Sequence, residues 1–211
     1  MNVMFSDLPG TVSSVNTVST QKRKYELKAR AEAQQATRAR IAAAATALHE
    51  EVGVGKTTVA DIARRAGVQR LTVYNHFPDL GALLPACSAH WLSEHPEPDL
   101  EPAFALEDPA ERLRAVLTAF YGWYRENRPM QLRVHGERAT VPELDEWMEQ
   151  TADRQLAELA GALAAGFDRP DARALVALAL DFWTWRRLDG EGLDDAAAAE
   201  LMTAAVRGRT G

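Results

Sequence analysis

Residues 57–77 read TTVADIARRAGVQRLTVYNHF, and three positions in this stretch decide the fold. Ala63 is a small residue, Gly67 follows four residues later, and Val73 comes six residues after that. Two helices that cross closely need a small residue at the crossing, a glycine in the turn and an aliphatic side chain that holds the second helix on the first. The spacing therefore predicts a helix-turn-helix, whose second helix lies in the major groove of DNA.

The polar residues of the second helix are expected to face away from this core. With Val73 and Phe77 buried, the outward set consists of hydrogen-bonding types suited to base edges and phosphates: Gln69, Arg70, Thr72, Asn75 and His76. Tyr74 is expected to place its hydroxyl on a phosphate while its ring packs. Thr58 is expected to cap the first helix of the pair.

Charge divides the chain into two parts. Residues 1–90 hold eleven Lys and Arg against seven Asp and Glu, whereas residues 91–211 hold thirteen against twenty-three. All four lysines lie in the first part, and Lys22, Arg23 and Lys24 form a basic cluster near its start. Local positive charge favours contact with phosphate, so the first part is expected to bind double-stranded DNA and these three residues to contact it.

Composition predicts an all-α protein. The 211 residues include 38 Ala and 23 Leu but 14 Val and 2 Ile, so helix formers far outnumber β-branched apolar residues. Residues 1–20 show no periodicity and are expected to form a flexible tail, and the proline-rich stretch 95–102 is expected to be a linker. About nine helices are predicted: 21–51, 58–66, 68–77, 80–91, 108–129, 130–137, 142–166, 170–188 and 194–206.

Other function classes find little support. A single cysteine, Cys87, cannot form an internal disulfide or a zinc framework, and the scattered histidines offer no metal or catalytic spacing, so no metal, cofactor or enzyme activity is predicted. Residues 53–58, GVGKTT, resemble a phosphate-binding loop, but the position that needs glycine is Glu50 and a helix precedes it. No membrane span or secretion signal is found, so a cytoplasmic protein is expected.

Residues 38–94 resemble the DNA-binding domain of the TetR family of bacterial transcriptional repressors. The matching positions are Thr58, Ile62, Ala63, Ala66, Gly67, Val68, Thr72, Val73, Tyr74, His76 and Phe77. The resemblance implies a three-helix head, a connecting helix, and a helical body that binds a small molecule and dimerises through its last two helices. It implies the domains 1–20 (tail), 21–79 (arm and DNA-binding domain) and 80–211 (connecting helix, effector binding and dimerisation).

Within the body, the resemblance implies a pocket for a small-molecule effector between helices. The candidate lining residues are aromatic side chains and methionines, several of them off the core stripe: Tyr121, Trp123, Met130, Trp147 and Met148. Residues 174–180, ALVALAL, are apolar on every side, so 170–188 is expected to pack with 194–206 against a second subunit. Asp181 is expected either to pair across that interface or to lie near the pocket.

Two positions depart from the family pattern. Leu71 stands where the family usually has glycine, and Leu80 stands where it usually has a lysine that meets a phosphate. The function predicted is a ligand-responsive transcriptional regulator, a repressor released from a near-palindromic operator and acting as a homodimer. The alternative is a ligand-binding or interaction protein of the same fold with weakened DNA binding.

Overall fold

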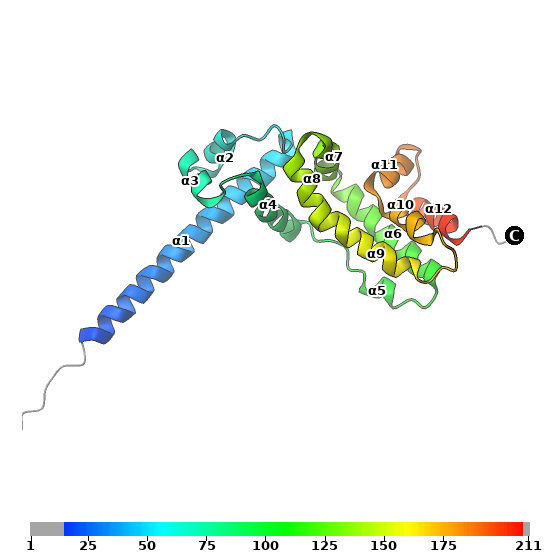
Figure 1. The fold of residues 1–211 in the computed structure, drawn as a ribbon, viewed down its shortest axis with the longest axis horizontal. Helices are drawn as coiled ribbons and strands as arrows, with labels where there is room; N and C mark the ends of the chain where they lie inside the picture. The colour runs from blue at the N-terminus through cyan, green and yellow to red at the C-terminus, as the bar shows by residue number, and fades with distance from the viewer. Residues whose placement is uncertain (1–14, 209–211) are drawn as a thin grey trace, which may run out of the picture. The chain divides into compact units, whose positions relative to one another are not determined.

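A computed structural model describes residues 15–208, and these residues form helices and connecting turns without a strand (Figure 1). The all-α expectation is confirmed. The chain divides into two compact units, Met1–Arg40 and Ile41–Gly211. Among the described helices, none is both long enough and apolar enough to cross a bilayer.

The first unit is helical over its described part, which belongs to α1 (Val15–Val52). Residues 15–20, to which the sequence analysis assigned no structure, are therefore helical. The physical reason is that no glycine or proline interrupts the chain between Val15 and Gly53. The rest of the expected tail, residues 1–14, lies outside the described residues. From Arg23 to Ala36 the side chains are exposed.

The head, residues 41–94, comprises the end of α1 and three further helices: α2 (Val59–Ala66), α3 (Arg70–His76) and α4 (Leu80–Glu94). They enclose a core whose buried members are Ile41, Ala42, Ala45, Ile62, Ala63, Val73, Phe77, Leu83 and Cys87. Val52, the last residue of α1, is exposed, whereas Val54 in the following turn is buried.

The body, residues 101–207, is a bundle in which α6 packs against α12 and α10 against α9. Its helices are α5 (Glu101–Phe104), α6 (Pro109–Glu126), α7 (Arg128–Glu137), α8 (Pro142–Met148), α9 (Arg154–Ala164), α10 (Ala172–Leu180), α11 (Phe182–Gly190) and α12 (Asp195–Arg207). A 3-10 turn, Arg138–Thr140, precedes α8, and a π-helical turn, Glu149–Asp153, joins α8 to α9. Asp108 caps α6 with Pro109 at its first position, as the sequence predicted.

The single helix expected at 170–188 is wrong. α10 ends at Leu180 because Asp181 adopts an extended backbone, with ψ 134°, and its carboxylate accepts a hydrogen bond from the Thr184 N–H at 2.9 Å. Asp181 is thus the N-cap of α11, a role that neither proposed alternative contained. The other differences in the described range are α5, which begins inside the expected linker, and the π-helical turn within the expected helix 142–166.

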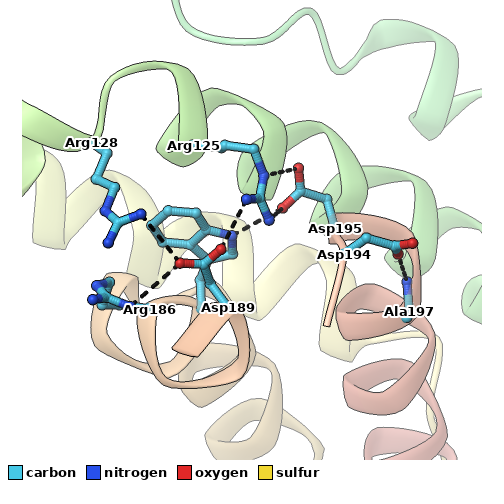
Figure 2. A network of polar contacts seen from close by, with 8 residues as sticks. Arg125, Arg128, Arg186, Asp189, Asp194, Asp195 and Ala197 are labelled. Atoms are coloured by element: carbon cyan, nitrogen blue, oxygen red, sulfur yellow. Dashed lines mark hydrogen bonds and ion pairs between the residues drawn. The ribbon is translucent and has the colours of Figure 1, made fainter. Parts of the chain in front are cut away.

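A polar network ties the end of α6 to α11 and α12 (Figure 2). Arg125 donates two hydrogen bonds to the carboxylate of Asp195, both at 2.9 Å, and one to Asp189 at 2.8 Å. Trp185 also donates to Asp195, at 3.1 Å. Burial alone would raise the pKa of Asp195, but the hydrogen bonds from Arg125 and Trp185 hold it below its ordinary value. The carboxylate therefore stays charged and fixes three helices together.

Candidate functional site

The geometry of the α2–α3 pair follows the sequence motif closely. The Thr58 hydroxyl accepts from the Asp61 N–H at 3.2 Å and so caps α2. Gly67 ends α2 in the left-handed region, with φ 66°, which disfavours any side chain, and the Val68 N–H donates to Ala63 O at 3.0 Å. Ala63 and Val73 are buried where the two helices meet.

The outer face of α3 carries the predicted DNA contacts. Gln69, Arg70, Tyr74 and Asn75 are exposed, and Thr72 and His76 are half-buried. All six side chains are therefore at least partly accessible to solvent, whereas Val73 of the same helix is buried. Such an arrangement of donors and acceptors fits the floor and walls of a DNA groove.

The positively charged side chains of the head differ in whether a carboxylate already pairs with them. Arg64 pairs with Asp61, and Arg65 pairs with Glu51 at 2.8 Å. Within the described part of the chain, Lys56 and Arg70 make no ion pair or side-chain hydrogen bond, so both are available to phosphate.

The predicted basic cluster lies on α1 in the first unit. Arg23 and Lys24 are exposed there, and the side chain of Lys22 lies outside the described part. Two exposed cations on one helix suit phosphate contact, which depends on charge more than on fixed geometry.

The two departures from the family pattern have different environments. Leu71 is 67% exposed on the face of α3 that carries the polar residues. Leu80, at the first position of α4, is half-buried and packs against a cluster that includes Leu84, Val141 and Leu144. Leu80 therefore contributes to the packing of α4 against Val141 and Leu144 of the body.

A cavity of about 600 Å³ lies between the head and the body, within the second unit. Four of the five predicted pocket residues line it, namely Trp123, Met130, Trp147 and Met148. Tyr121 does not, because its ring is fully buried in the body core and its hydroxyl donates to Ala179 O at 2.8 Å. Two aromatic rings of the wall contact each other: Trp91 packs edge-on against Trp123, with ring centroids 5.7 Å apart.

Three lining residues carry buried polar groups without a partner in the described structure. His49 Nε2 and Trp91 Nε1 are fully buried atoms on residues that are 4% and 8% exposed. Gln131 is 6% exposed, and its side-chain amide makes no hydrogen bond within the described residues. Burial lowers the pKa of His49 to about 4, although nearby Glu137 opposes the shift. His49 is thus neutral near pH 7. Buried groups of this kind cost free energy unless they are hydrogen-bonded.

None of these three residues was predicted from the sequence to line the pocket. His49 follows the buried Ile41 and Ala45 at the same four-residue spacing, so its position on the core stripe was a usable signal. Trp91 ends the helix expected at 80–91, and that expectation did not mark it as a pocket residue. No local pattern distinguishes Gln131 from an exposed glutamine, since its burial depends on helices distant in the sequence.

A joint connects α7 to the turn between α1 and α2. Glu137 accepts a hydrogen bond from the Gly55 N–H at 2.9 Å. Gly53 has φ 95°, and a Cβ built there would lie 1.8 Å from Glu137 Oε1, so the carboxylate fills the space that a side chain would need. Arg133 adds a hydrogen bond to Glu51 O at 3.1 Å. This turn and α7 therefore contact each other through polar groups, and the Glu137 carboxylate lies where any side chain larger than that of glycine at position 53 would have to be.

Apolar packing surrounds the joint. Val54 from the turn and Leu84 from α4 pack with Val141, Leu144 and Met148 from the body. All but Val141 also line the cavity. The packing that connects head to body is thus also one wall of the cavity.

A second surface of the body is apolar and exposed. Leu178 on α10 is 52% exposed and Leu201 on α12 is 49% exposed. We call these two leucines, together with three of the exposed alanines of the two helices, the α10/α12 face: Ala174, Ala177, Leu178, Leu201 and Ala204. The two helices also contact each other. A face of small and apolar residues on adjacent helices suits packing against another helical pair.

Two other candidate sites are structural. Cys87 is buried in the head core, and burial raises the pKa of its thiol to about 11, which keeps it unreactive near pH 7. The GVGKTT stretch follows helix α1, and the Thr57 hydroxyl donates to Gly53 O at 2.7 Å, so the loop is closed on itself.

Comparison with known proteins places the head in one family. Residues 41–87 match the model of the bacterial regulatory proteins of the tetR family. Over 163 residues the chain is 30% identical to the HTH-type transcriptional regulator BetI of Serratia proteamaculans strain 568, which covers 72% of this chain and 82% of that protein.

Solved structures share the fold. A TetR-like transcriptional regulator from Rhodococcus sp. RHA1 superposes with a TM-score of 0.57 at 22% identity, covering 79% of this chain and 91% of that one. A second transcriptional regulator from Rhodococcus sp. Rha1 gives the same TM-score and identity and covers 94% of its own chain. The similarity extends through most of this chain, beyond the head.

Proposed function

This chain belongs to the TetR family of bacterial regulatory proteins, and from that premise we propose that it is a repressor that a small molecule releases from a near-palindromic operator. It is a DNA-binding transcriptional regulator, and its relatives are regulators rather than enzymes. Its place of action would be the cytoplasm, where the operator is. The observation that carries the proposal is the cavity shared by head and body, since its wall is also the joint that positions the head.

The head reads DNA through α3. Gln69, Arg70 and Thr72 reach base edges in the major groove, and Tyr74, Asn75 and His76 approach phosphates. Lys22, Arg23 and Lys24 add backbone contacts. Thr58 lies at the exposed N-terminus of α2, where the backbone N–H groups and the helix dipole favour a phosphate.

The body forms a homodimer through the α10/α12 face. A two-fold axis brings the same face of each subunit together, so four helices bury the exposed leucines and alanines. The symmetry also provides two heads for two half-sites, which is why the operator is expected to be near-palindromic.

Release follows from the joint. A molecule in the cavity contacts Leu84, Leu144 and Met148, which also pack around the turn that Glu137 holds. Occupancy that displaces α7 or α8 therefore moves the turn between α1 and α2, and with it the head. A ligand that favours this moved state lowers the affinity for DNA by its differential affinity for the two states.

A gel-shift titration tests the function. The DNA upstream of the protein's own gene should be shifted at protein concentrations at least about tenfold lower than random DNA of equal length, because specific sites usually bind 10³–10⁷ times more tightly. Equal shifts of both DNAs would instead support the second candidate, a ligand-binding protein of this fold with weakened DNA binding. The exposed Leu71 on the reading face and the half-buried Leu80 are the observations that favour that alternative.

A further inference from the structure

The walls of the cavity carry no cation. Among its lining residues, all of them in the described part of the chain, none is a lysine or arginine, and the single carboxylate, Glu97, is exposed. Arg125 pairs with Asp189 and Asp195, Arg138 pairs with Asp145 and Asp153, and Arg133 donates a hydrogen bond to Glu51 O. Nothing in this arrangement would neutralise a buried anion.

The two lining histidines do not change that balance. Burial lowers the pKa of His49 to about 4, and burial also lowers the pKa of His135, whose ring stacks on Phe182 with centroids 4.8 Å apart. Both rings are expected to be neutral near pH 7. A carboxylate or phosphate would therefore lose its hydration without gaining a counter-charge, which costs far more than burying a neutral group.

The uncharged polar groups point to what the cavity does take. The Trp91 indole N–H is a donor, and the Gln131 amide and the neutral His49 ring can each donate and accept. They come from three elements, α4, α7 and α1, and none has a partner in the described structure. A hydroxyl or carbonyl group on the ligand would satisfy one or more of them without bringing charge.

Most of the remaining wall is aromatic and apolar, and the other polar lining residues, Thr46, Ser88, Thr151 and Gln155, are uncharged. Trp123 and Trp147, together with Phe120, offer ring surface, and Met130 and Met148 offer adaptable thioethers. A cation would gain some attraction from the rings, but among the lining residues the exposed Glu97 carries the one carboxylate that could pair with it.

We infer that the effector is an uncharged, largely aromatic or alicyclic molecule with at least one hydroxyl or carbonyl group, and that the cavity rejects its carboxylate counterparts. The inference rests on the proposed role of this cavity as the effector site. Its test uses the full chain without DNA, so failure of charge selection and failure of repression are separate results.

Calorimetric titration with three matched probes tests this inference: 2-naphthol, 2-naphthoate and protonated 2-naphthylmethylamine. At pH 7.5 the neutral 2-naphthol should bind at least about tenfold more tightly than either charged probe. Equal or tighter binding of 2-naphthoate, or of the amine, would overturn the inference. So would the absence of saturable binding for all three probes.

Variants locate the hydrogen bonds. Gln131→Leu and Trp91→Phe should each weaken 2-naphthol binding by about threefold to tenfold, and should leave the binding of naphthalene nearly unchanged. Gln150→Leu, at an exposed position outside the cavity, and Trp183→Phe, on a 44% exposed ring, are the matched controls. Unchanged 2-naphthol affinity in both cavity variants would overturn the assignment of these groups, and the second variant keeps the test decisive should one fail to fold.

Discussion

The head and the body differ in what their helices leave unfilled. In the head, short helices close around a small core with Ile41, Ala63 and Val73 almost completely buried, and polar groups occupy the outside of α3. The body has a larger core, and between head and body lies a cavity of about 600 Å³, into whose lining the head contributes the unpartnered His49 and Trp91. The difference fits the proposed function, in which a fixed DNA-reading surface is coupled to a region whose packing changes when a ligand fills the cavity.

Breaking the α10/α12 face should have the largest effect. Leu178→Glu places a charge in the proposed dimer contact twice, once per subunit, while burial of each leucine contributes about 1.5–3 kcal/mol. In sedimentation at micromolar concentration, the wild type should have twice the 23.2 kDa mass of one chain, and the variant should be monomeric.

Leu132→Glu, at a 37% exposed position on α7, is the control and should stay dimeric. A wild-type protein that sediments as a single chain would contradict the proposed interface.

His49 lines the cavity between the head and the body, and its neutral state predicts that the stability of the folded protein depends on pH. The pKa is about 4 in the folded protein and 6.5 ordinarily, so the unfolded chain binds more protons between these values. Stability should be fully present above about pH 6.5 and should fall by up to about 3 kcal/mol on acidification to about pH 4.

Urea unfolding across this range measures the effect. His49→Gln should flatten the profile, whereas His90→Gln, at the half-buried position on α4, should follow the wild type. The same slope in His49→Gln as in the wild type would show that other groups cause the acid sensitivity.

Gly53→Ala tests the contact between the turn after α1 and Glu137 of α7. At φ 95° an alanine is strained, and its Cβ would displace the Glu137 carboxylate and its hydrogen bond. The substitution should lower the free energy of unfolding by about 2 kcal/mol, since such backbone conformations cost about 1–3 kcal/mol. Thermal unfolding measures it.

Gly136→Ala is the matched control. It lies one residue before Glu137, and nothing lies within 4 Å of an added Cβ. It should raise stability by about 0.5–1 kcal/mol, as alanine does inside helices. A Gly53→Ala protein as stable as the wild type would contradict the described joint.

The smallest effect is expected on the reading surface itself. Tyr74→Phe removes one hydroxyl from a 51% exposed side chain. If that hydroxyl donates a hydrogen bond to a phosphate, its loss should weaken the free energy of DNA binding by about 0.5–1.5 kcal/mol per subunit. The loss should be equal for operator and random DNA. By contrast, Gln69→Ala should change the preferred sequence, which competition assays with altered half-sites reveal. No change in affinity for Tyr74→Phe would exclude the phosphate contact.

Much of the head was predictable because its rules are local. Ala63, Gly67 and Val73 meet steric requirements at fixed offsets, and Thr58 caps α2 through a hydrogen bond to a residue three positions away. The same rule at Asp181 was overlooked, since the apolar run before it suggested one continuous helix. A cap inside an apolar stretch is easily missed when hydrophobic periodicity alone is followed.

The body was less predictable because its site is built from distant contacts. Tyr121 and Trp123 are two residues apart on one helix, yet one lies in the core and the other lines the cavity. Glu137 reaches Gly55 across 82 positions of sequence. Burial of Gln131 likewise depends on the packing of α7 against its neighbours, which no single stretch encodes.

The measurement that tests the central claim most directly is the effect of a cavity ligand on DNA affinity. Fluorescence anisotropy of labelled upstream DNA should be titrated with wild type and with Glu137→Ala, each with and without saturating 2-naphthol. We predict that 2-naphthol weakens DNA binding by the wild type at least about fivefold, and that of Glu137→Ala less than about twofold. Unchanged DNA affinity of the wild type when calorimetry shows the probe bound would contradict the coupling of cavity and head.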